Sequence, residues 1–245
     1  MKVVIIDQAR MTSTRLPGKV LKPVLGKPLL EYQIERLRRV AHADELVIAT
    51  TTNASDDVLV DFCRQHGVKV YRGSEMDVLS RYYGAATESG ADVVVRVTSD
   101  CPVIDPAVVD QVIVHYLDHR DEYDYVSNTQ VRSFPRGMDA EVFSMGALES
   151  AYHEGRLEYE REHVTPFLYR HPERFKVGQW VFREDRGDER WTVDTPEDLE
   201  LVRRIIEALY PRKPEFTLVD ILELLDRHPG WRQINTHIIQ KKLGE

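Results

Sequence analysis

Three cationic side chains lie close together near the start of the chain, at Arg10, Arg15 and Lys19. They follow the apolar run at residues 3–6 and are separated by hydroxyl side chains and a Pro-Gly turn. A loop that leaves the carboxyl end of a parallel strand offers oriented N–H donors, while Arg adds a planar fork and Lys a mobile point charge. We therefore expect a loop that grips several phosphates, as in a nucleoside triphosphate site.

The loop differs from the common phosphate-binding motifs. It has neither the Gly-x-x-x-x-Gly-Lys-Ser/Thr pattern of a Walker A loop nor the three spaced glycines of the dinucleotide fingerprint. This argues against a P-loop NTPase and a classical NAD enzyme. The alternative is a solvated basic loop beside a core strand.

Two aspartates further along suit a metal ion. Asp100 follows the largely apolar run 92–98, and Asp194 lies in a second expected strand-to-helix junction at 190–198. Carboxylates and phosphate oxygens are the ligands that Mg²⁺ prefers. Turn chemistry is the alternative for Asp100. In the second junction, Thr195 and Asp198 resemble a capping box and need no chemical role.

Strand-like and helical patterns alternate over the first half of the chain, which predicts a Rossmann-like three-layer αβα sandwich with a mostly parallel sheet. The expected strands are 3–6, 45–50, 68–71, 92–97 and 124–127, and the expected helices are 28–41, 56–66, 77–89 and 106–119.

The remaining chain divides into an inserted arm and an appendage. Residues 128–190 break the alternation and include a charged helix expected at 158–171, so they suit acceptor recognition and dimerisation. We expect a catalytic domain at 1–210 and a helical appendage at 211–245, whose amphipathic helix 217–227 docks on the sandwich or on a partner subunit.

Composition indicates a cytoplasmic protein without a membrane span. The 33 basic and 41 acidic residues give a net charge of -8, which offers no support for binding nucleic-acid backbones. Asp7 and Arg10 interrupt the first apolar run, so we expect no signal peptide, and no run approaches ~20 apolar residues. The two cysteines, Cys63 and Cys101, have no metal-binding or disulfide pattern.

Several blocks of sequence resemble the sugar-activating cytidylyltransferases, which include CMP-KDO synthetases and acylneuraminate cytidylyltransferases. The resemblance is closest to the spore coat polysaccharide biosynthesis protein F family. The blocks, in order, are Ala9-Arg10-x-x-Ser13-Thr14-Arg15-Leu16-Pro17-Gly18-Lys19, Gly26-Lys27-Pro28-Leu29-Leu30, Ser99-Asp100-Cys101-Pro102, Pro135-x-Gly137-x-Asp139-x-Glu141, Arg161-Glu162-His163-Val164-Thr165-Pro166 and Thr192-Val193-Asp194-Thr195-Pro196-Glu197-Asp198.

The resemblance implies a GT-A type fold, a homodimer, CTP and a sugar acceptor as substrates, and Mg²⁺ bound by Asp100 and Asp194. Arg10, Arg15 and Lys19 are the implied catalytic cations. The implied nucleotide-binding residues are Gln8, Ala9, Arg10, Ser13, Arg15, Lys19, Ser74 and Arg81.

The arm supplies the expected acceptor contacts, namely Arg136, Asp139, Glu141 and His163. Arg132 and Arg136 suit a sugar carboxylate, and Asp139 and Glu141 suit sugar hydroxyls. Three of these residues have a structural alternative: Arg136 and Asp139 can pair with each other, and His163 can cap a helix end rather than act as a general base. For Ser74, the alternative is the N-cap of helix 77–89, with Asp77 in the first turn.

One position departs from the family pattern. Relatives usually carry Gly where this chain has Thr12, and Gly lets the backbone approach a phosphate without a Cβ. The Thr12 hydroxyl can substitute as a donor.

The sequence therefore predicts Mg²⁺-dependent transfer of CMP from CTP to an acidic, ulosonic-type sugar for surface polysaccharide synthesis. One alternative is a glycosyltransferase on the same scaffold, for which Asp139-Ala140-Glu141 is an imperfect Asp-x-Asp motif. Another is a nucleotide-binding module that has lost catalysis, for which Thr12 is the only sequence support.

Overall fold

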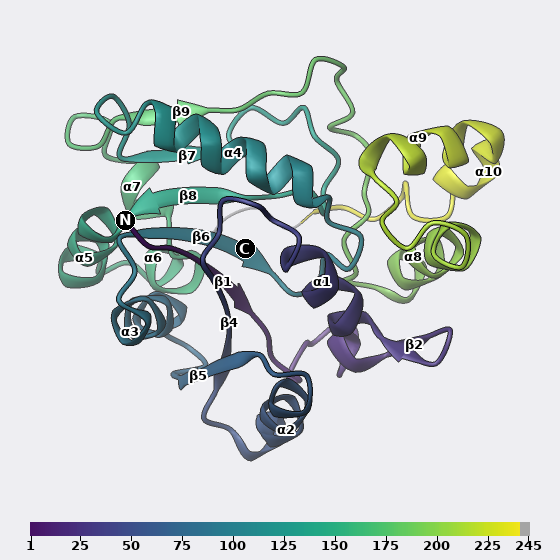
Figure 1. The fold of residues 1–245 in the computed structure, drawn as a ribbon, viewed down its shortest axis with the longest axis horizontal. Helices are drawn as coiled ribbons and strands as arrows, with labels where there is room; N and C mark the ends of the chain where they lie inside the picture. Colours follow the sequence, from purple (N-terminus) through teal and green to yellow (C-terminus); the bar gives the residue numbers. More distant parts are fainter. Residues whose placement is uncertain (241–245) are drawn as a thin grey trace.

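The central sheet has seven strands in the order β5-β4-β1-β6-β8-β7-β9 (Figure 1), in a computed structural model that describes residues 1–240. Strand β8 runs antiparallel to both its neighbours, and every other pair is parallel. The predicted mostly parallel sheet is thus confirmed. The strands are β1 Val3–Gln8, β4 Glu45–Thr51, β5 Lys69–Gly73, β6 Val93–Thr98, β7 Tyr125–Ser127, β8 Glu141–Ser144 and β9 Val177–Gln179.

Helices cover both faces of the sheet and complete the predicted three layers. One face packs against α3, α5 and α7, and the other against α1, α2 and α4 (Figure 1). These helices are α1 Leu29–Leu37, α2 Asp57–Gln65, α3 Val78–Ser89, α4 Pro106–Asp118, α5 Met145–Glu154 and α7 Pro166–Tyr169. Smaller elements are η1 Lys19–Leu21, η2 Ala54–Asp56, α6 Glu158–His163 and a hairpin of β2 Pro23–Val24 with β3 Lys27–Pro28.

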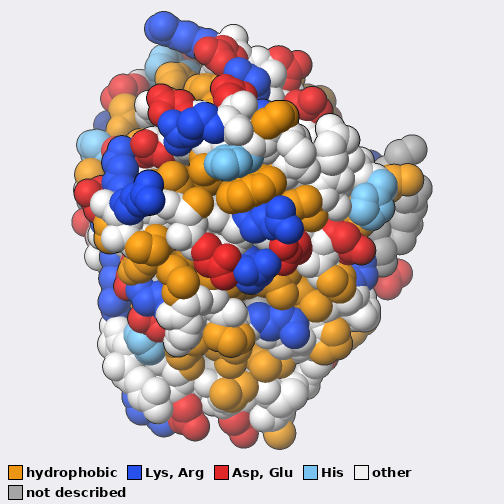
Figure 2. Space-filling model, turned by 90° about the vertical axis from the view of Figure 1, so that its right-hand side faces the viewer, with side chains coloured by type: hydrophobic (Ala, Val, Ile, Leu, Met, Phe, Trp, Pro, Cys, Tyr) orange, Lys and Arg blue, Asp and Glu red, His pale blue; other side chains and the backbone are white. Residues whose placement is uncertain are grey.

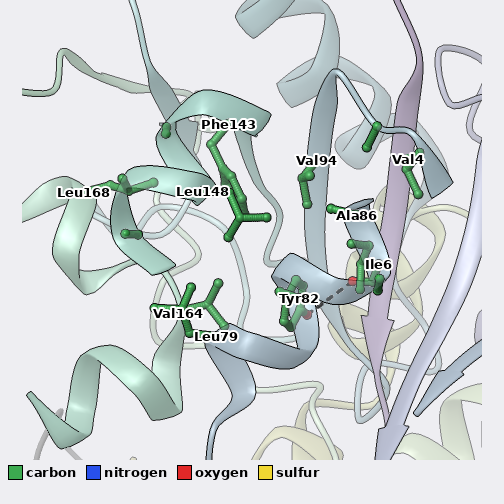
Figure 3. Packing of buried hydrophobic residues seen from close by; sticks show 14 of the residues in the cluster. Val4, Ile6, Leu79, Tyr82, Ala86, Val94, Phe143, Leu148, Val164 and Leu168 are labelled. Atoms are coloured by element: carbon green, nitrogen blue, oxygen red, sulfur yellow. Dashed lines mark hydrogen bonds between the residues drawn. The ribbon is translucent and has the colours of Figure 1, made fainter. Parts of the chain in front are cut away.

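Alternation along β1 sends its side chains to the two layers in turn. Val4 and Ile6 pack against α3, where Tyr82 reaches back over the sheet (Figure 3). The Tyr82 hydroxyl donates to the backbone oxygen of Val97 at 2.9 Å and lies 3.2 Å from that of Ile6. The ring of Tyr82 is buried and its hydroxyl has a hydrogen-bond partner. This side chain therefore links β1 and β6 near their carboxyl ends.

Two expected helices are shorter than predicted. Helix α1 ends at Leu37 rather than at residue 41, because the N–H groups of Arg39 and Val40 bond three residues back and tighten the last turn. The helix expected at 158–171 is two helices, α6 and α7. Val164 between them has φ +72°, and Pro166 lacks the N–H that a continuous helix needs.

Residues 128–190 are less separate from the sheet than predicted, because they supply β8, α5 and β9. The strand expected before Asp194 is also absent from the described sheet, since Arg190 makes only an isolated bridge with Arg136. The capping box at the start of α8 (Pro196–Leu209) is present, with Thr195 and Asp198 as its two members.

The C-terminal helices dock on the sandwich, which was one of the two expected outcomes. Leucine and isoleucine side chains of α9 (Leu218–Arg227) pack against α8, and α10 (Pro229–Arg232) follows. No helix within residues 1–240 combines the length and apolar character that a bilayer crossing requires. The face that turns toward the viewer in Figure 2 carries acidic and basic side chains side by side, without one dominant sign.

Candidate functional site

A cleft of about 880 Å³ opens at the carboxyl ends of β1 and β6. It brings together ten of the side chains predicted for the site, from segments that lie far apart in the sequence. These are Gln8, Arg10, Ser13, Arg15, Lys19, Asp100, Arg136, Asp139, His163 and Asp194. The predicted phosphate loop, the two aspartates and part of the arm therefore face one space.

The two predicted metal ligands converge on one ammonium group. Lys19 Nζ lies 2.9 Å from Asp100 Oδ2 and 2.8 Å from Asp194 Oδ1, and all three side chains are largely buried. Asp100 comes from the loop after β6 and Asp194 from the loop before α8. The hypothesis that these distant carboxylates share one cation requires this proximity.

Burial and pairing act in opposite directions on this cluster. Burial lowers the pKa of Lys19, but the charges of Asp100 and Asp194 outweigh it, so the pKa lies above its ordinary value. Burial likewise raises the pKa of Asp100, yet Lys19 and a hydrogen bond of 2.6 Å from Thr98 bring it below the usual range. The ammonium and this carboxylate are therefore both charged near neutral pH.

Two arginines complete the surroundings of Asp194. Its Oδ2 accepts from Arg190 Nη2 at 2.8 Å and lies 3.0 Å from Arg15 Nη2. Arg190 in turn donates to the fully buried Asp198 at 2.9 and 3.0 Å. The sequence analysis assigned Asp198 only to a helix cap. In the structure it also holds the guanidinium that contacts Asp194.

Arg10 has a weaker partner than the other two cations of the phosphate loop. Among the residues that the structure describes, its one ion pair is a distant contact with Glu75, at 3.4 Å, and the Thr12 hydroxyl also bonds to that carboxylate. Asn53 donates to the second Glu75 oxygen at 2.5 Å. The sequence analysis missed Glu75 as a partner of the loop, because nothing in its spacing relates it to residues 65 positions earlier.

A second pocket of about 290 Å³ adjoins the cleft and includes Gln8, Ala9, Arg10 and Arg81 among its lining residues. The predicted contact Ser74 does not line it. Its Oγ accepts from the backbone N–H of Asp77, and Asp77 is the N-cap of α3, so the capping roles suggested for these two residues were wrong.

A third pocket, of about 210 Å³, lies toward the arm and is lined in part by Arg96, Asp139, Glu141 and His163. Glu141 is buried with both oxygens engaged. One is bonded to Arg96, and the other accepts from Tyr125 at 2.6 Å and from Thr165 at 2.5 Å.

Asp139 and Glu141 have separate partners. Asp139 pairs with Arg132, and the suggested pairing with Arg136 is absent among the described residues. The two carboxylates thus do not form the shared site that an Asp-x-Asp glycosyltransferase motif would need. The glycosyltransferase alternative loses its only sequence support.

His163 ends α6 at the point where the three spaces meet, since it lines the cleft and both smaller pockets. Burial lowers its pKa although Glu162 opposes the shift. The imidazole is therefore neutral near pH 7 and able to accept a proton.

Asp7 is a buried carboxyl near Asp100 to which the sequence analysis gave no role. It is fully buried on β1, and neither of its oxygens has a partner within the described residues. Burial, together with the charge of Asp100, raises its pKa well above the ordinary value. The sequence signal that could have indicated this buried carboxyl is an aspartate at the end of an apolar strand.

A mostly parallel sheet with a cationic loop and paired carboxylates at its carboxyl edge defines a nucleotidyltransferase-like α/β protein. The chain belongs to the cytidylyltransferase family, whose model matches residues 3–222. The resemblance inferred from sequence blocks is confirmed.

Individual relatives agree with this family. The chain is 35% identical to the spore coat polysaccharide biosynthesis protein SpsF of Bacillus subtilis, over 93% of this chain and 95% of that protein. It is also 35% identical to the 3-deoxy-manno-octulosonate cytidylyltransferase of Geobacter sulfurreducens, but over only 46% and 44% of the two chains.

A solved cytidylyltransferase from Leptospira borgpetersenii superposes with a TM-score of 0.90 at 35% identity, covering 99% of this chain and 100% of that one. A CMP-2-keto-3-deoxy-manno-octonic acid synthetase solved with CTP gives 0.63 at 20% identity, covering 85% and 99%. This second likeness confirms the predicted fold.

Proposed function

We propose that this chain transfers CMP from CTP to a hydroxyl of an acidic sugar and releases pyrophosphate, with Mg²⁺ as its cofactor. The observation that carries the proposal is the convergence of Asp100 and Asp194 on one cation beside the loop that bears Arg10 and Arg15. Membership of the cytidylyltransferase family supports the choice of CMP as the transferred group.

In the proposed reaction, an acceptor oxygen forms a bond to the α-phosphorus of CTP. The bond from that phosphorus to the oxygen that bridges it to the β-phosphate breaks, and pyrophosphate leaves with the electron pair. Arg10, Arg15 and Lys19 hold the phosphates and neutralise their charge, so that positioning and electrostatics supply most of the catalysis. The acceptor proton passes to the neutral imidazole of His163.

The residues present suit Mg²⁺. The Lys19 ammonium lies between the two carboxylates, so this position accepts a positive charge. Within residues 1–240 no group of three or more acidic, His or Cys side chains forms a closed metal site. Two carboxylates with phosphate oxygens and water are a usual ligand set for Mg²⁺. Bound there, it would polarise the α-phosphate and acidify the acceptor hydroxyl.

Arg136 supports an acidic acceptor. Arg136 lines the cleft together with Arg132, and burial and the positive charges of Arg132 and Arg190 lower its pKa. Across residues 1–240 it makes no ion pair. A carboxylate on the sugar would supply the missing negative charge with two parallel hydrogen bonds. The names of the relatives, which refer to a spore coat polysaccharide and an octulosonate, support a surface polysaccharide sugar of ulosonic type.

Pyrophosphate release from each of the four nucleoside triphosphates, against a panel of ulosonic acids and neutral sugars, tests the proposal. We expect release with CTP and an acidic sugar, a CMP-sugar in the phosphorus NMR spectrum, loss of turnover with a chelator and recovery with Mg²⁺. No turnover with any pair, despite bound CTP, would contradict it. The expected homodimer is tested separately by light scattering, and the cytoplasmic location by cell fractionation.

A further inference from the structure

The segment 233–240 returns to the acidic end of the cleft after α10 (Figure 1). Asn235 is almost fully buried, and its Nδ2 donates to Asp198 Oδ1 at 2.8 Å and to the backbone oxygen of Arg190 at 3.0 Å. Gln240 lines the cleft, and its Oε1 accepts from Arg190 Nη1 at 2.5 Å. Both residues therefore contact groups that surround Asp194 without contacting Asp194 itself.

Arg190 is held on three sides. Its Nε bonds to Asp198, its Nη2 to both Asp198 and Asp194, and its Nη1 to Gln240. Only 6% of its side chain is exposed. Because a guanidinium is planar and rigid, its contact with Gln240 also restrains the Nη2 that reaches Asp194.

Asp198 fixes the backbone at the same place. Its Oδ2 accepts from the N–H groups of Asp194 at 3.0 Å and Thr195 at 3.1 Å. Its other oxygen, Oδ1, accepts from Asn235 and from Arg190 Nε. The backbone and the side chain of Asp194 are thus both set by groups that the segment 233–240 supports.

Ile234 packs against the apolar core around α8 and α9, but hydrogen bonds join the segment to Arg190 and Asp198. A cavity of about 390 Å³ lies between the segment and residues 187–190, and its lining is mainly polar and charged. The segment is attached here by directed hydrogen bonds. Such bonds fix an orientation, whereas packing alone leaves side chains freer to adjust.

We propose that Asn235 and Gln240 are positioning residues that hold Asp194 in place for Mg²⁺ through Arg190 and Asp198. The inference rests on the proposed function, because it takes Asp194 as a metal ligand. Groups that orient a metal ligand commonly change metal affinity or activity 10- to 100-fold when they are removed. Asn235 and Gln240 act one step further out, so effects at or below the lower end of that range are expected.

Mn²⁺ binding to the full chain with CTP, followed by the electron paramagnetic resonance signal of free Mn²⁺, tests the inference. In Asn235→Asp the shape is kept, but a carboxylate faces Asp198, and we expect the Mn²⁺ dissociation constant to rise about tenfold. In Gln240→Met the length is kept and the acceptor lost, and a rise of about threefold is expected. The control Thr236→Val alters an exposed hydroxyl whose one bond within residues 1–240 lies in its own turn, and it should match the wild type.

Measurements without metal distinguish an effect on the position of Asp194 from a loss of folding or of CTP binding. CTP affinity without metal and the thermal midpoint should stay near wild type in Gln240→Met, because this residue is exposed. In pyrophosphate release, the half-saturating Mg²⁺ concentration should rise while the KM for CTP at saturating Mg²⁺ changes little. If Asn235→Asp does not fold, Gln240→Met decides.

Unchanged Mn²⁺ affinity in Gln240→Met, or an equal loss of metal-free CTP affinity, would overturn the inference. Failure of the proposed reaction would look different: the wild type would bind Mn²⁺ and CTP but give no CMP-sugar. The variant Asp194→Asn tests whether Asp194 is a metal ligand at all. If it binds Mn²⁺ as the wild type does, Asp194 is not a ligand and its positioning has no role in metal binding.

Discussion

The two sides of the cleft both carry charged residues, but these residues differ in burial and in ion pairing. On the acidic side, Lys19, Asp100 and Asp194 have side chains that are 12 to 20% exposed, and they pair with one another. On the loop side, Arg10 is 42% exposed and its ion pair is 3.4 Å long. Lys19 belongs to the loop in sequence, yet in space it belongs to the acidic side.

This difference separates a preorganised region from an adaptable one. Buried and paired charges keep a fixed geometry, which suits a group that must be in place before substrate arrives. An exposed arginine with a weak partner, such as Arg10, costs little to reorient, which suits phosphates that arrive and leave. Changes on the acidic side should therefore reduce the rate of the chemical step, and changes on the loop side should mainly weaken binding of CTP.

The largest effect is expected for Asp100→Asn. Loss of the charge removes a proposed metal ligand and one of two partners of Lys19, so kcat should fall about a hundredfold or more. Pyrophosphate release at saturating CTP measures it. The matched control is Asp121→Asn at an exposed site, which should retain wild-type rates. A fall in kcat below threefold, with Mg²⁺ dependence intact, would remove Asp100 from the chemistry.

The second effect concerns Asp7, the buried carboxyl on β1. Its folded-state pKa is raised by burial, so below the ordinary value of 3.8 the folded and unfolded chains are both protonated there. As the pH rises above that value, the unfolded chain ionises first, and stability is lost until the folded pKa is reached. Asp7→Asn stays neutral throughout and should be more stable than the wild type by about 2 kcal/mol at pH 8.

Urea unfolding between pH 5 and pH 8 measures this difference. The gap between wild type and Asp7→Asn should widen as the pH rises, whereas Asp121→Asn should follow the wild type. A gap that stays constant with pH would show that the Asp7 carboxyl is ionised in the folded chain, with a partner that the structure does not show.

A smaller effect is expected on the loop side, from Arg10→Ala. Loss of this guanidinium should raise the KM for CTP about tenfold, as for one charge-assisted contact to phosphate. The thermal midpoint should change little, because the ion pair lost with Glu75 is long and exposed. Arg64→Ala is the control, since that side chain is 74% exposed and its ion pair among the described residues is with the neighbouring Asp61. A tenfold fall in kcat instead would place Arg10 with the preorganised groups.

The sequence predicted positions next to strands and helices better than it predicted distant partners. The proximity of Asp100 and Asp194 was predicted because residues after buried strands and before capped helices have few possible positions. The tertiary partners of Glu75, Glu141 and Asp198 were not predicted, because these partners lie between 8 and 63 residues away in the sequence. No local pattern records which way such side chains point.

The dependence on distant partners also explains which strands of the sheet were predicted. The parallel strands β1, β4, β5 and β6 have five to seven residues, with helices between them that repeat their apolar positions, so the pattern is long enough to recognise. Strands β8 and β9 have four and three residues and were not predicted. Their place is decided by pairing with distant strands, which composition over so few residues cannot show.

The smallest effect is expected for Thr12→Gly, the change toward the usual family residue. The substitution removes a hydroxyl bonded to Glu75, but Asn53 still donates to that carboxylate at 2.5 Å, and the backbone gains room near the phosphates. These effects oppose each other, so kcat and the KM for CTP should change less than threefold. Thr12→Ser keeps the hydroxyl and should match the wild type. A tenfold rise in kcat for Thr12→Gly would mean that the Thr12 side chain obstructs catalysis, which would favour a nucleotide-binding module with impaired chemistry over an efficient transferase.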